Sequence, residues 1–328
     1  MNSSALATEG VPRSRNKIIL TVVYFGSWPE WFPAFLLSCA ANRDVDWLIL
    51  TDCDCRHIAC PNIRHVSISM DSLNLMAGNA LGIRVKKGPY SQLDLRPAYG
   101  EILGQFYEGY DFWGHVDVDV IWGNIREFIS DDMLDSSDII SSRRDCLAGH
   151  FTVYRNCPLV NSLYKRYREW SLIMGDYLYH HFDEKGMGIF IKYCFPKDLV
   201  GTVRVEWSRS LVLDWWPLAR RRQGWEWRNG RLFDGTGEEH MYIHFMTWKP
   251  YMQHIDFQAG ERPTSFRVTH RGIWSQPMGL VDKVREWFPF RFLARSYLRY
   301  VAWYWVDSSR WLCFLRPKQH AKRGQVEA

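Results

Sequence analysis

Two acidic residues, Asp117 and Asp119, are separated by one residue inside the largely apolar segment 111–122. Residues two apart on a strand share a face, and at the end of a strand both carboxylates can reach one cation. Mg²⁺ and Mn²⁺ prefer oxygen ligands and often keep substrate phosphates in their remaining positions. A lone Asp-x-Asp pair is common, but charges among apolar residues are costly unless they are used. The pair therefore predicts a divalent-cation site, with a solvated turn as the alternative.

A strand that ends in this pair needs a sheet around it, and the preceding sequence has the pattern of one. Apolar, β-branched runs at 17–25, 45–51 and 63–68 predict buried strands, and residues 29–41 are typical of a helix. Strand, helix and strand at this spacing indicate a mostly parallel α/β sheet with right-handed crossovers. Ligands of such sheets bind beyond the carboxyl ends of the strands, where the acidic pair would lie.

Further elements are expected around this core. Residues 93–107 and 158–172 have the pattern of helices, and residues 111–122 that of a single strand. Shorter strands are expected at 139–142, 150–154 and 241–246, and a hairpin at 225–233 around Asn229-Gly230, a strong hairpin signal. We therefore expect a disordered tail at 1–16, a main domain at 17–255, a helical extension at 256–316 and a basic tail at 317–328.

The composition is that of a globular chain. Of 328 residues, 47% are hydrophobic and 23% charged. The aromatic share of 16% suits stacking on sugars or bases, contact with a membrane surface, or core packing. No window is long and apolar enough for a transmembrane helix, and residues 1–16 lack the apolar stretch of a signal peptide. We therefore expect a cytoplasmic protein with reduced cysteines.

Three of the cysteines form a local cluster: Cys53, Cys55 and Cys60 lie close to His57. Their spacing does not follow the paired C-x2-C pattern of zinc sites. A loop of reduced thiols is therefore favoured over a zinc site.

The positive charge lies near the C-terminus. The net charge is +5, but residues 282–328 contain ten Lys/Arg against four Asp/Glu and carry +6, which leaves −1 for the rest. Arg291, Arg295 and Arg299 repeat every four residues among aromatic and aliphatic side chains. A helix over 281–316 would either lie on an anionic membrane surface, at the inner face of the cytoplasmic membrane, or pack on the main domain. The near-neutral body argues against nucleic acid as a partner.

The segments around the acidic pair resemble a known family. They are residues 93–99, 110–119 and 149–156, together with Tyr24-Phe-Gly26 and Thr51-Asp52 at the ends of the first two strands. Across residues 17–250 they resemble an uncharacterised bacterial family regarded as GT-A-type glycosyltransferases. More distantly, the chain is similar to glycogenin-like and galactosyltransferase-like retaining enzymes. The resemblance implies a GT-A-like, Rossmann-like domain and metal-dependent transfer of a sugar from a nucleotide-diphosphate sugar.

The distant relatives also suggest a set of metal ligands. In them an Arg on a helix precedes the Asp-x-Asp strand, and a late His-x-x-Gly-x-x-Lys motif supplies a metal ligand and a diphosphate contact. The late segment of this chain, 244–250, lacks the glycine and is one residue shorter. By this resemblance, Mn²⁺ or Mg²⁺ would be held by Asp117, Asp119 and His244, with Asp119 as the catalytic ligand and Lys249 on the leaving diphosphate.

The same resemblance assigns roles in donor binding. Tyr24, Asp52 and Arg96 are expected to line the nucleotide pocket, together with Asp117 and Lys249. The donor would be a UDP- or GDP-sugar, and the acceptor a glycan or a lipid-linked saccharide in bacterial surface polysaccharide synthesis.

Four more residues are candidates for contact with the sugar or the acceptor. Gly149 and His150 open the strand after the metal strand, where related folds touch the sugar. Asp183 and Glu184 precede a glycine at an expected helix start, so one of them would be the general base of an inverting enzyme. In a retaining enzyme they would only bind sugar hydroxyls, and an acidic pair is also ordinary at a helix N-terminus.

Two other classes of function remain as alternatives. A non-catalytic nucleotide-sugar or glycan-binding accessory protein would share the fold but would not need the complete ligand set. A metal-dependent phosphohydrolase would use carboxylate ligands too, but such sites gather more Asp and His ligands in close motifs than this chain offers.

Overall fold

The computed structural model describes residues 15–280 apart from 56–59, 144–145, 196–198, 200–201, 208–211, 214–223, 247, 253 and 259. The chain divides into one unit that spans Met1–Pro277 and a second that spans Met278–Ala328. The helix expected at 281–316, the basic tail at 317–328 and nearly all of the tail expected at 1–16 lie outside the described residues. Within the described ranges, no helix has the length and apolar character needed to cross a bilayer.

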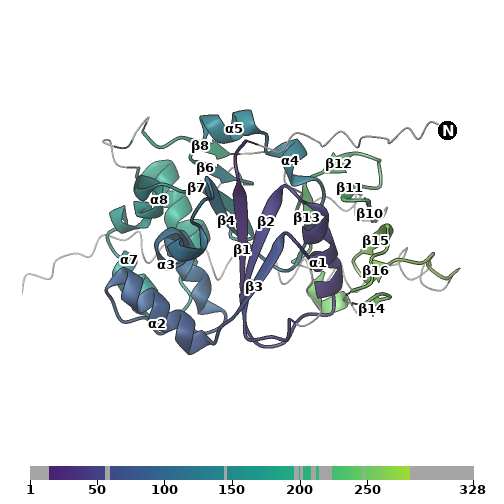
Figure 1. Ribbon diagram of the computed structural model, residues 1–328, viewed down its shortest axis with the longest axis horizontal. Coiled ribbons are helices and arrows are strands. Elements are labelled where there is room, and N and C mark those ends of the chain that lie inside the picture. Colours follow the sequence, from purple (N-terminus) through teal and green to yellow (C-terminus); the bar gives the residue numbers. More distant parts are fainter. Residues whose placement is uncertain are drawn as a thin grey trace, which may run out of the picture. The chain divides into compact units, whose positions relative to one another are not determined.

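A seven-stranded sheet lies at the centre of the first unit, in the order β3-β2-β1-β4-β7-β6-β8 (Figure 1). Strands β3, β2, β1 and β4 are parallel, and β8 is parallel to β6. Strand β7 runs antiparallel to β4 and β6. The predicted α/β fold with a central, mostly parallel sheet is confirmed. The strands are β1 (Ile18–Tyr24), β2 (Val45–Thr51), β3 (Ile63–Ser67), β4 (Phe112–Val116), β6 (Ile139–Ser141), β7 (Phe151–Arg155) and β8 (Val205–Trp207).

Both faces of this sheet are buried, which explains the continuous apolar runs in its parallel strands. Along β1, Ile18, Leu20 and Val22 belong to one buried cluster, whereas Ile19 and Val23 belong to another. Helix α1 (Phe32–Ala41) packs with the first cluster, and α2 (Met70–Leu81) and α3 (Tyr99–Ile102) pack with the second. Figure 1 shows α1 on one side of the sheet and α2 and α3 on the other.

The two long helices expected at 93–107 and 158–172 are broken into short turns. The first consists of the 3-10 helix η1 (Ser91–Ala98), α3 and η2 (Gly104–Phe106). Pro97 lies inside η1, where it removes one backbone donor and disfavours the α conformation of the preceding residue. The second consists of α6 (Pro158–Asn161), η3 (Leu163–Arg166) and α7 (Trp170–Gly175).

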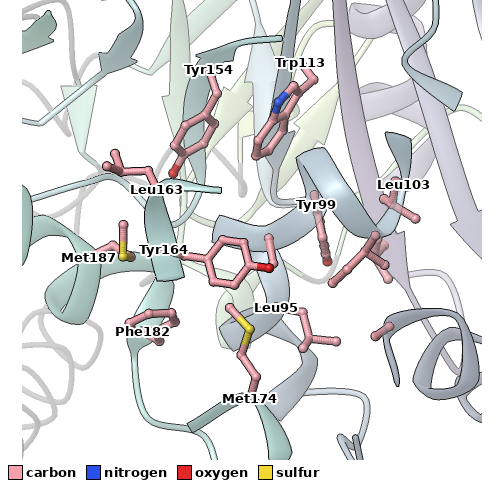
Figure 2. Close-up of a cluster of buried hydrophobic side chains, with 14 of the residues drawn as sticks. Leu95, Tyr99, Leu103, Trp113, Tyr154, Leu163, Tyr164, Met174, Phe182 and Met187 are labelled. Carbon is pink, nitrogen blue, oxygen red and sulfur yellow. The ribbon is translucent and has the colours of Figure 1, made fainter. Parts of the chain in front are cut away.

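These short turns are held by a dense aromatic core rather than by helix length (Figure 2). Leu95 and Tyr99 pack there with Trp113 of β4, and Tyr164 and Phe182 complete the same cluster. Leu95 precedes Arg96, and Phe182 precedes Asp183. The core therefore fixes the backbone on which two of the candidate charged residues lie.

The single strand expected at 111–122 is also interrupted. It ends as β4 at Val116 and resumes as β5 (Val120–Trp122), which belongs to a separate three-stranded sheet with β13 (Tyr242–His244) and β9 (Val212–Leu213). The acidic pair lies in the connection between β4 and β5. The acidic pair thus lies where the chain passes from the seven-stranded sheet to the three-stranded sheet.

A six-stranded sheet, β12-β11-β10-β15-β16-β14, contains the predicted hairpin. At the turn, Asn229 and Gly230 have φ angles of 48° and 84°, as a tight hairpin turn requires. Residues 265–274, which were expected in a helical extension, form a hairpin in this sheet, in which the buried Phe266 and Val268 flank the exposed Arg267. The expected boundary at 255 falls at β14, which pairs with β16. The strands are β10 (Trp225–Arg228), β11 (Arg231–Phe233), β12 (Glu239–His240), β14 (His254–Ile255), β15 (Ser265–Thr269) and β16 (Gly272–Trp274).

The remaining elements are short. They are α4 (Ile125–Phe128), α5 (Asp131–Ser136), the π-helical turn η4 (Phe182–Gly186), α8 (Met187–Tyr193) and the 3-10 turn η6 (Lys249–Tyr251).

Candidate metal centre

The backbone that carries the two aspartates is fixed at every residue. The Asp117 amide donates to the His150 carbonyl at 3.2 Å, and the Phe245 amide donates to the Asp119 carbonyl at 3.1 Å. Between them, the Trp31 indole donates to the Val118 carbonyl at 3.0 Å. The acidic pair therefore lies in a segment whose backbone is hydrogen-bonded to three other parts of the chain, and not in a solvated turn.

Asp117, Asp119 and His244, the three ligands that the family resemblance implies, converge in the structure. One ligand atom from each lies within 4.8 Å of the other two. His244 is brought there by the antiparallel pairing of β13 with β5, which sets His244 opposite Val120. The side chain of Asp119 is 2% exposed and that of Asp117 is 28% exposed, so the site is open on the Asp117 side. The two carboxylates suit Mn²⁺ and Mg²⁺, and the imidazole is a further ligand type of divalent transition metals.

A cationic side chain completes this cluster. Lys249 Nζ lies 2.5 Å from Asp119 Oδ2, and His244 Nε2 lies 3.2 Å from the same atom. Burial acts to raise the pKa of Asp119, but Lys249 and His244 outweigh it and hold the pKa well below its ordinary value. Burial acts to lower the pKa of Lys249, and the two aspartates raise it above its ordinary value. Asp119 is thus anionic and Lys249 cationic at neutral pH.

Arg96 takes a different place from the one expected. It was predicted to line the nucleotide pocket; in the structure it is 4% exposed and bridges three groups. It donates to the Gly149 carbonyl at 2.5 Å, to Asp183 Oδ2 at 3.2 Å and to Asp117 Oδ1. A planar guanidinium can hold several acceptors in fixed directions, so Arg96 orients Asp117 toward the cluster.

The carboxylates of the predicted acidic pair 183–184 have separate environments. Asp183 lies on the π-helical turn η4, accepts from Tyr179 and Arg96, and has a side chain that is 1% exposed. Burial raises the pKa of Asp183 well above its ordinary value, and Arg96 opposes this. Glu184 is half-buried and lies 3.3 Å from the Gly149 amide. The expected helix start is present, because α8 begins at Met187 directly after this turn, and Glu184 is the more accessible of the two acids.

His150 supports His244 instead of facing open space. Its ring stacks on that of His244 at 4.1 Å, with an angle of 15° between the ring planes. Its Nε2 atom lies 2.7 Å from the hydroxyl of Tyr242, which donates to Ser142. Burial lowers the pKa of His150 well below its ordinary value, so the ring is neutral. The direct sugar contact predicted for this ring is not supported by its burial, and Gly149 touches Arg96 and Glu184.

Tyr24 and Asp52 lie at the carboxyl ends of β1 and β2, as expected. Asp52 Oδ1 accepts from the Gly26 amide at 2.8 Å, and the Tyr24 hydroxyl donates to the Ser27 carbonyl at 3.0 Å. Burial raises the pKa of Tyr24, and charges that include Lys249 and Asp119 act on it as well. These residues therefore belong to the same end of the sheet as the candidate metal ligands.

The cysteine cluster has no disulfide among its described members: Cys53, Cys55 and Cys60 are free thiols. His57 lies outside the described residues. The expectation of reduced thiols in place of a zinc site thus stays a prediction.

The sequence gives no signal for several residues that border this centre. Tyr90 is 67% exposed, and its ring meets the edge of Tyr179 at 4.8 Å. Desolvation and the charges of Asp117, Asp183 and Glu184 raise the pKa of Tyr90. A lone tyrosine in a Gly-Pro-Tyr turn has no pattern that would single it out beforehand.

The fold and this cluster define a class: an α/β protein whose mostly parallel sheet leads into an Asp–Asp–His site suited to a divalent cation. The chain belongs to a family of unknown function, DUF6625, whose model matches residues 20–277. No curated protein matches the sequence.

Among solved structures, the chain is similar to the galactosyltransferase LgtC in complex with donor and acceptor sugar analogs, at 11% identity and a TM-score of 0.30 over 50% of this chain and 66% of that one. It is also similar to mouse xyloside xylosyltransferase 1, at 11% identity and a TM-score of 0.30 over 48% of this chain and 73% of that one. A third is the glycosyltransferase GlyE of Streptococcus pneumoniae TIGR4, at 10% identity and a TM-score of 0.28 over 60% and 55%. At this level of similarity nothing follows about activity.

Proposed function

We propose that the protein is a metal-dependent glycosyltransferase that moves a sugar from a nucleotide-diphosphate sugar to a glycan or a lipid-linked acceptor. The observation that carries the proposal is the convergence of Asp117, Asp119 and His244, with the Lys249 ammonium at the same carboxylate. Two anionic ligands, one imidazole and one ammonium around a partly open site match what a diphosphate and a divalent ion need together.

A divalent cation held there would offset the negative charge that develops on a diphosphate as the sugar–phosphate bond breaks. The chain's own residues supply the rest of the environment. Lys249 carries a positive charge, and its side chain is 40% exposed. It would therefore bind the diphosphate directly. Arg96 and His150 hold the ligands Asp117 and His244 in place.

Tyr24 and Asp52 would bind the nucleoside, because they lie at the carboxyl ends of the neighbouring parallel strands. Glu184 is the better placed acid for an acceptor hydroxyl, because Asp183 is engaged by Arg96. If the reaction inverts the anomeric centre, Glu184 would act as the general base, and if it retains, Glu184 would bind a sugar hydroxyl. An NMR time course of the anomeric product separates the two.

A thermal-shift screen of UDP-, GDP- and CMP-sugars, with and without Mn²⁺, tests the proposal. A donor present at 100 times its Kd stabilises the folded chain by about 2.7 kcal/mol, provided that it binds only the folded state. We expect a metal-dependent rise in Tm for one nucleotide class, and release of free nucleotide on incubation with that donor. Both effects should disappear in Asp119→Asn and persist in Asp44→Asn, which removes an exposed carboxylate elsewhere.

Equal melting temperatures with every donor, with and without Mn²⁺, would contradict the proposal. Binding that depends on the metal, but without hydrolysis or transfer after prolonged incubation, would instead favour a non-catalytic nucleotide-sugar-binding protein. UDP- and GDP-sugars are the first donors to test, and acceptors from bacterial surface polysaccharides the first acceptors.

A further inference from the structure

A second group of ligand-type side chains lies outside this site, in the turn between β11 and β12 and in β12 itself. Asp234, Glu238 and His240 each place one oxygen or nitrogen atom within 4.8 Å of the other two. They lie within the seven-residue segment 234–240, and no role proposed above involves them. This group has to be explained separately, because two of its three members are buried.

Asp234 uses its two oxygens differently. Oδ1 accepts from the Thr236 amide at 2.8 Å, the Thr236 hydroxyl at 2.5 Å and the Glu238 amide at 3.1 Å, so it shapes the turn. Oδ2 has no hydrogen-bond partner among the described residues, although the side chain is 1% exposed. An ordinary turn needs only the first oxygen.

His240 shows the same feature from the other side. Its Nε2 atom also lacks a hydrogen-bond partner among the described residues, and its side chain is 8% exposed. It lies 3.3 Å from Asp234 Oδ2, so two buried polar atoms face one another without forming a well-directed hydrogen bond. Leaving a buried polar atom unsatisfied costs about 1–3 kcal/mol, which a ligand shared by both atoms would remove.

We propose that Asp234, Glu238 and His240 bind a divalent cation, and that Zn²⁺ is the best fit. Imidazole nitrogen and carboxylate oxygen are both ligand types of Zn²⁺, a given site of nitrogen and oxygen ligands generally binds Zn²⁺ more tightly than Mn²⁺, and Mg²⁺ and Ca²⁺ prefer oxygen alone. Glu238 is exposed, so its carboxylate would close over an ion that the two buried residues already face. The site is separate from the Asp117–Asp119–His244 cluster, and the proposal does not depend on the proposed function.

The position of this site suggests a structural role. The strand after His240 is β13, which ends at His244, and the Gly123 amide donates to the Met241 carbonyl at 2.7 Å. A Cβ at Gly123 would meet the His240 carbonyl at 2.4 Å, so this end of the β5–β13 pair is packed tightly against the turn. A cation here would brace the strand that carries His244, from the end opposite the first site, roughly 13 Å away at the rise of a strand.

Equilibrium dialysis of the full chain against ZnCl₂, followed by elemental analysis, tests this proposal. The experiment is carried out in an Asp119→Asn background, which disables the first site. We expect one equivalent of Zn²⁺ in that background, a Kd at least about tenfold weaker after His240→Asn, and no change after His65→Asn, which removes an exposed histidine. Glu238→Gln gives a second test, because its exposed side chain can be changed without disturbing the core.

Co²⁺ as a probe distinguishes this site from the thiols. A site made of nitrogen and oxygen gives cobalt d–d absorption without the thiolate charge-transfer band that cysteine ligands produce. Failure to bind Zn²⁺ in the Asp119→Asn chain would overturn the proposal. So would binding that neither His240→Asn nor Glu238→Gln weakens, or a cobalt complex that shows the thiolate band.

Discussion

Replacing Arg96 by Met tests whether this residue is the central support of the candidate site. The substitution keeps most of the side-chain volume and removes the charge that Asp117 and Asp183 share. Asp183 would then lie in the core with a carboxyl group that is 1% exposed and without its cation. We expect a chain that still folds but is strongly destabilised, in a way that depends on pH.

The size of the effect follows from the burial of the two partners. Breaking a buried ion pair on one side costs about 3–5 kcal/mol, because it leaves an uncompensated charge. Asp117 is 28% exposed, so the loss of its pair adds only about 0–1 kcal/mol. Together the free energy of unfolding should fall by about 3–6 kcal/mol at pH 7, a large share of the stability of a typical domain.

The sign of the pH dependence is also fixed. Burial raises the pKa of Asp183 in the folded chain, and Arg96 opposes this, so the pKa rises further in the variant. A carboxyl group with a raised folded-state pKa is fully tolerated below its ordinary pKa of about 3.9 and costs stability as the pH rises above it. The deficit of the variant should therefore grow with pH between the raised pKa of Asp183 in the wild type and its still higher pKa in the variant, by at most about 1.4 kcal/mol per pH unit.

Urea unfolding followed by tryptophan fluorescence, in buffer with EDTA, measures this deficit at pH 5 and pH 8. Arg96→Met with Asp183→Asn is the matched double variant. Its loss of stability should be about 1–3 kcal/mol smaller than the sum of the losses in the two single variants. A deficit that is the same at both pH values, or effects that simply add in the double variant, would refute the idea that Arg96 compensates the buried Asp183.

Three further outcomes are expected. Gly149→Ala should lose about 1–3 kcal/mol of stability, because a Cβ there would meet the Glu184 side chain at 2.7 Å, and Glu184→Ala should restore part of it in the double variant. Asp138→Asn should lower the free energy of unfolding by about 1–3 kcal/mol at pH 7. Burial acts to raise the pKa of Asp138, but Arg204 and Arg155 outweigh it and lower the pKa. The difference from wild type in urea unfolding should therefore close below about pH 4. His150→Ala should weaken Mn²⁺ binding by about 10–100-fold in calorimetry, because His244 loses its stacked support, and unchanged affinity would count against that role.

The parallel strands and the acidic pair were predictable because their signals are local. Continuous apolar runs mark strands that are buried on both faces, and β1 and β2 match their expected ranges within a residue. Asp117 and Asp119 stood out because they interrupt such a run. The chain breaks its strand at that point, which a pattern of alternating apolar residues does not show.

The rest of the site depends on contacts that are far apart in sequence. His244 reaches Asp119 across 125 positions through the pairing of β5 with β13, so only the family resemblance pointed to it. The buried role of Arg96 and the stacking of His150 on His244 arise from tertiary packing, which a spacing pattern cannot encode. The helix expected at 93–107 failed for a local reason, since Pro97 is better accommodated in 3-10 turns held by an aromatic core.

The connection between β4 and β5 is completed only by the late strand β13, and this has a consequence during synthesis on the ribosome. A nascent chain that has emerged only as far as Met241 contains both aspartates but lacks the imidazole and the ammonium that adjoin Asp119. Pairing between strands that are far apart in sequence is slow relative to local structure, so both aspartates are present before His244 and Lys249 can reach them. Cation uptake would then report that β13 has paired with β5, and a fragment truncated before β13 would still contain the strands of the parallel sheet but would not acquire the ion.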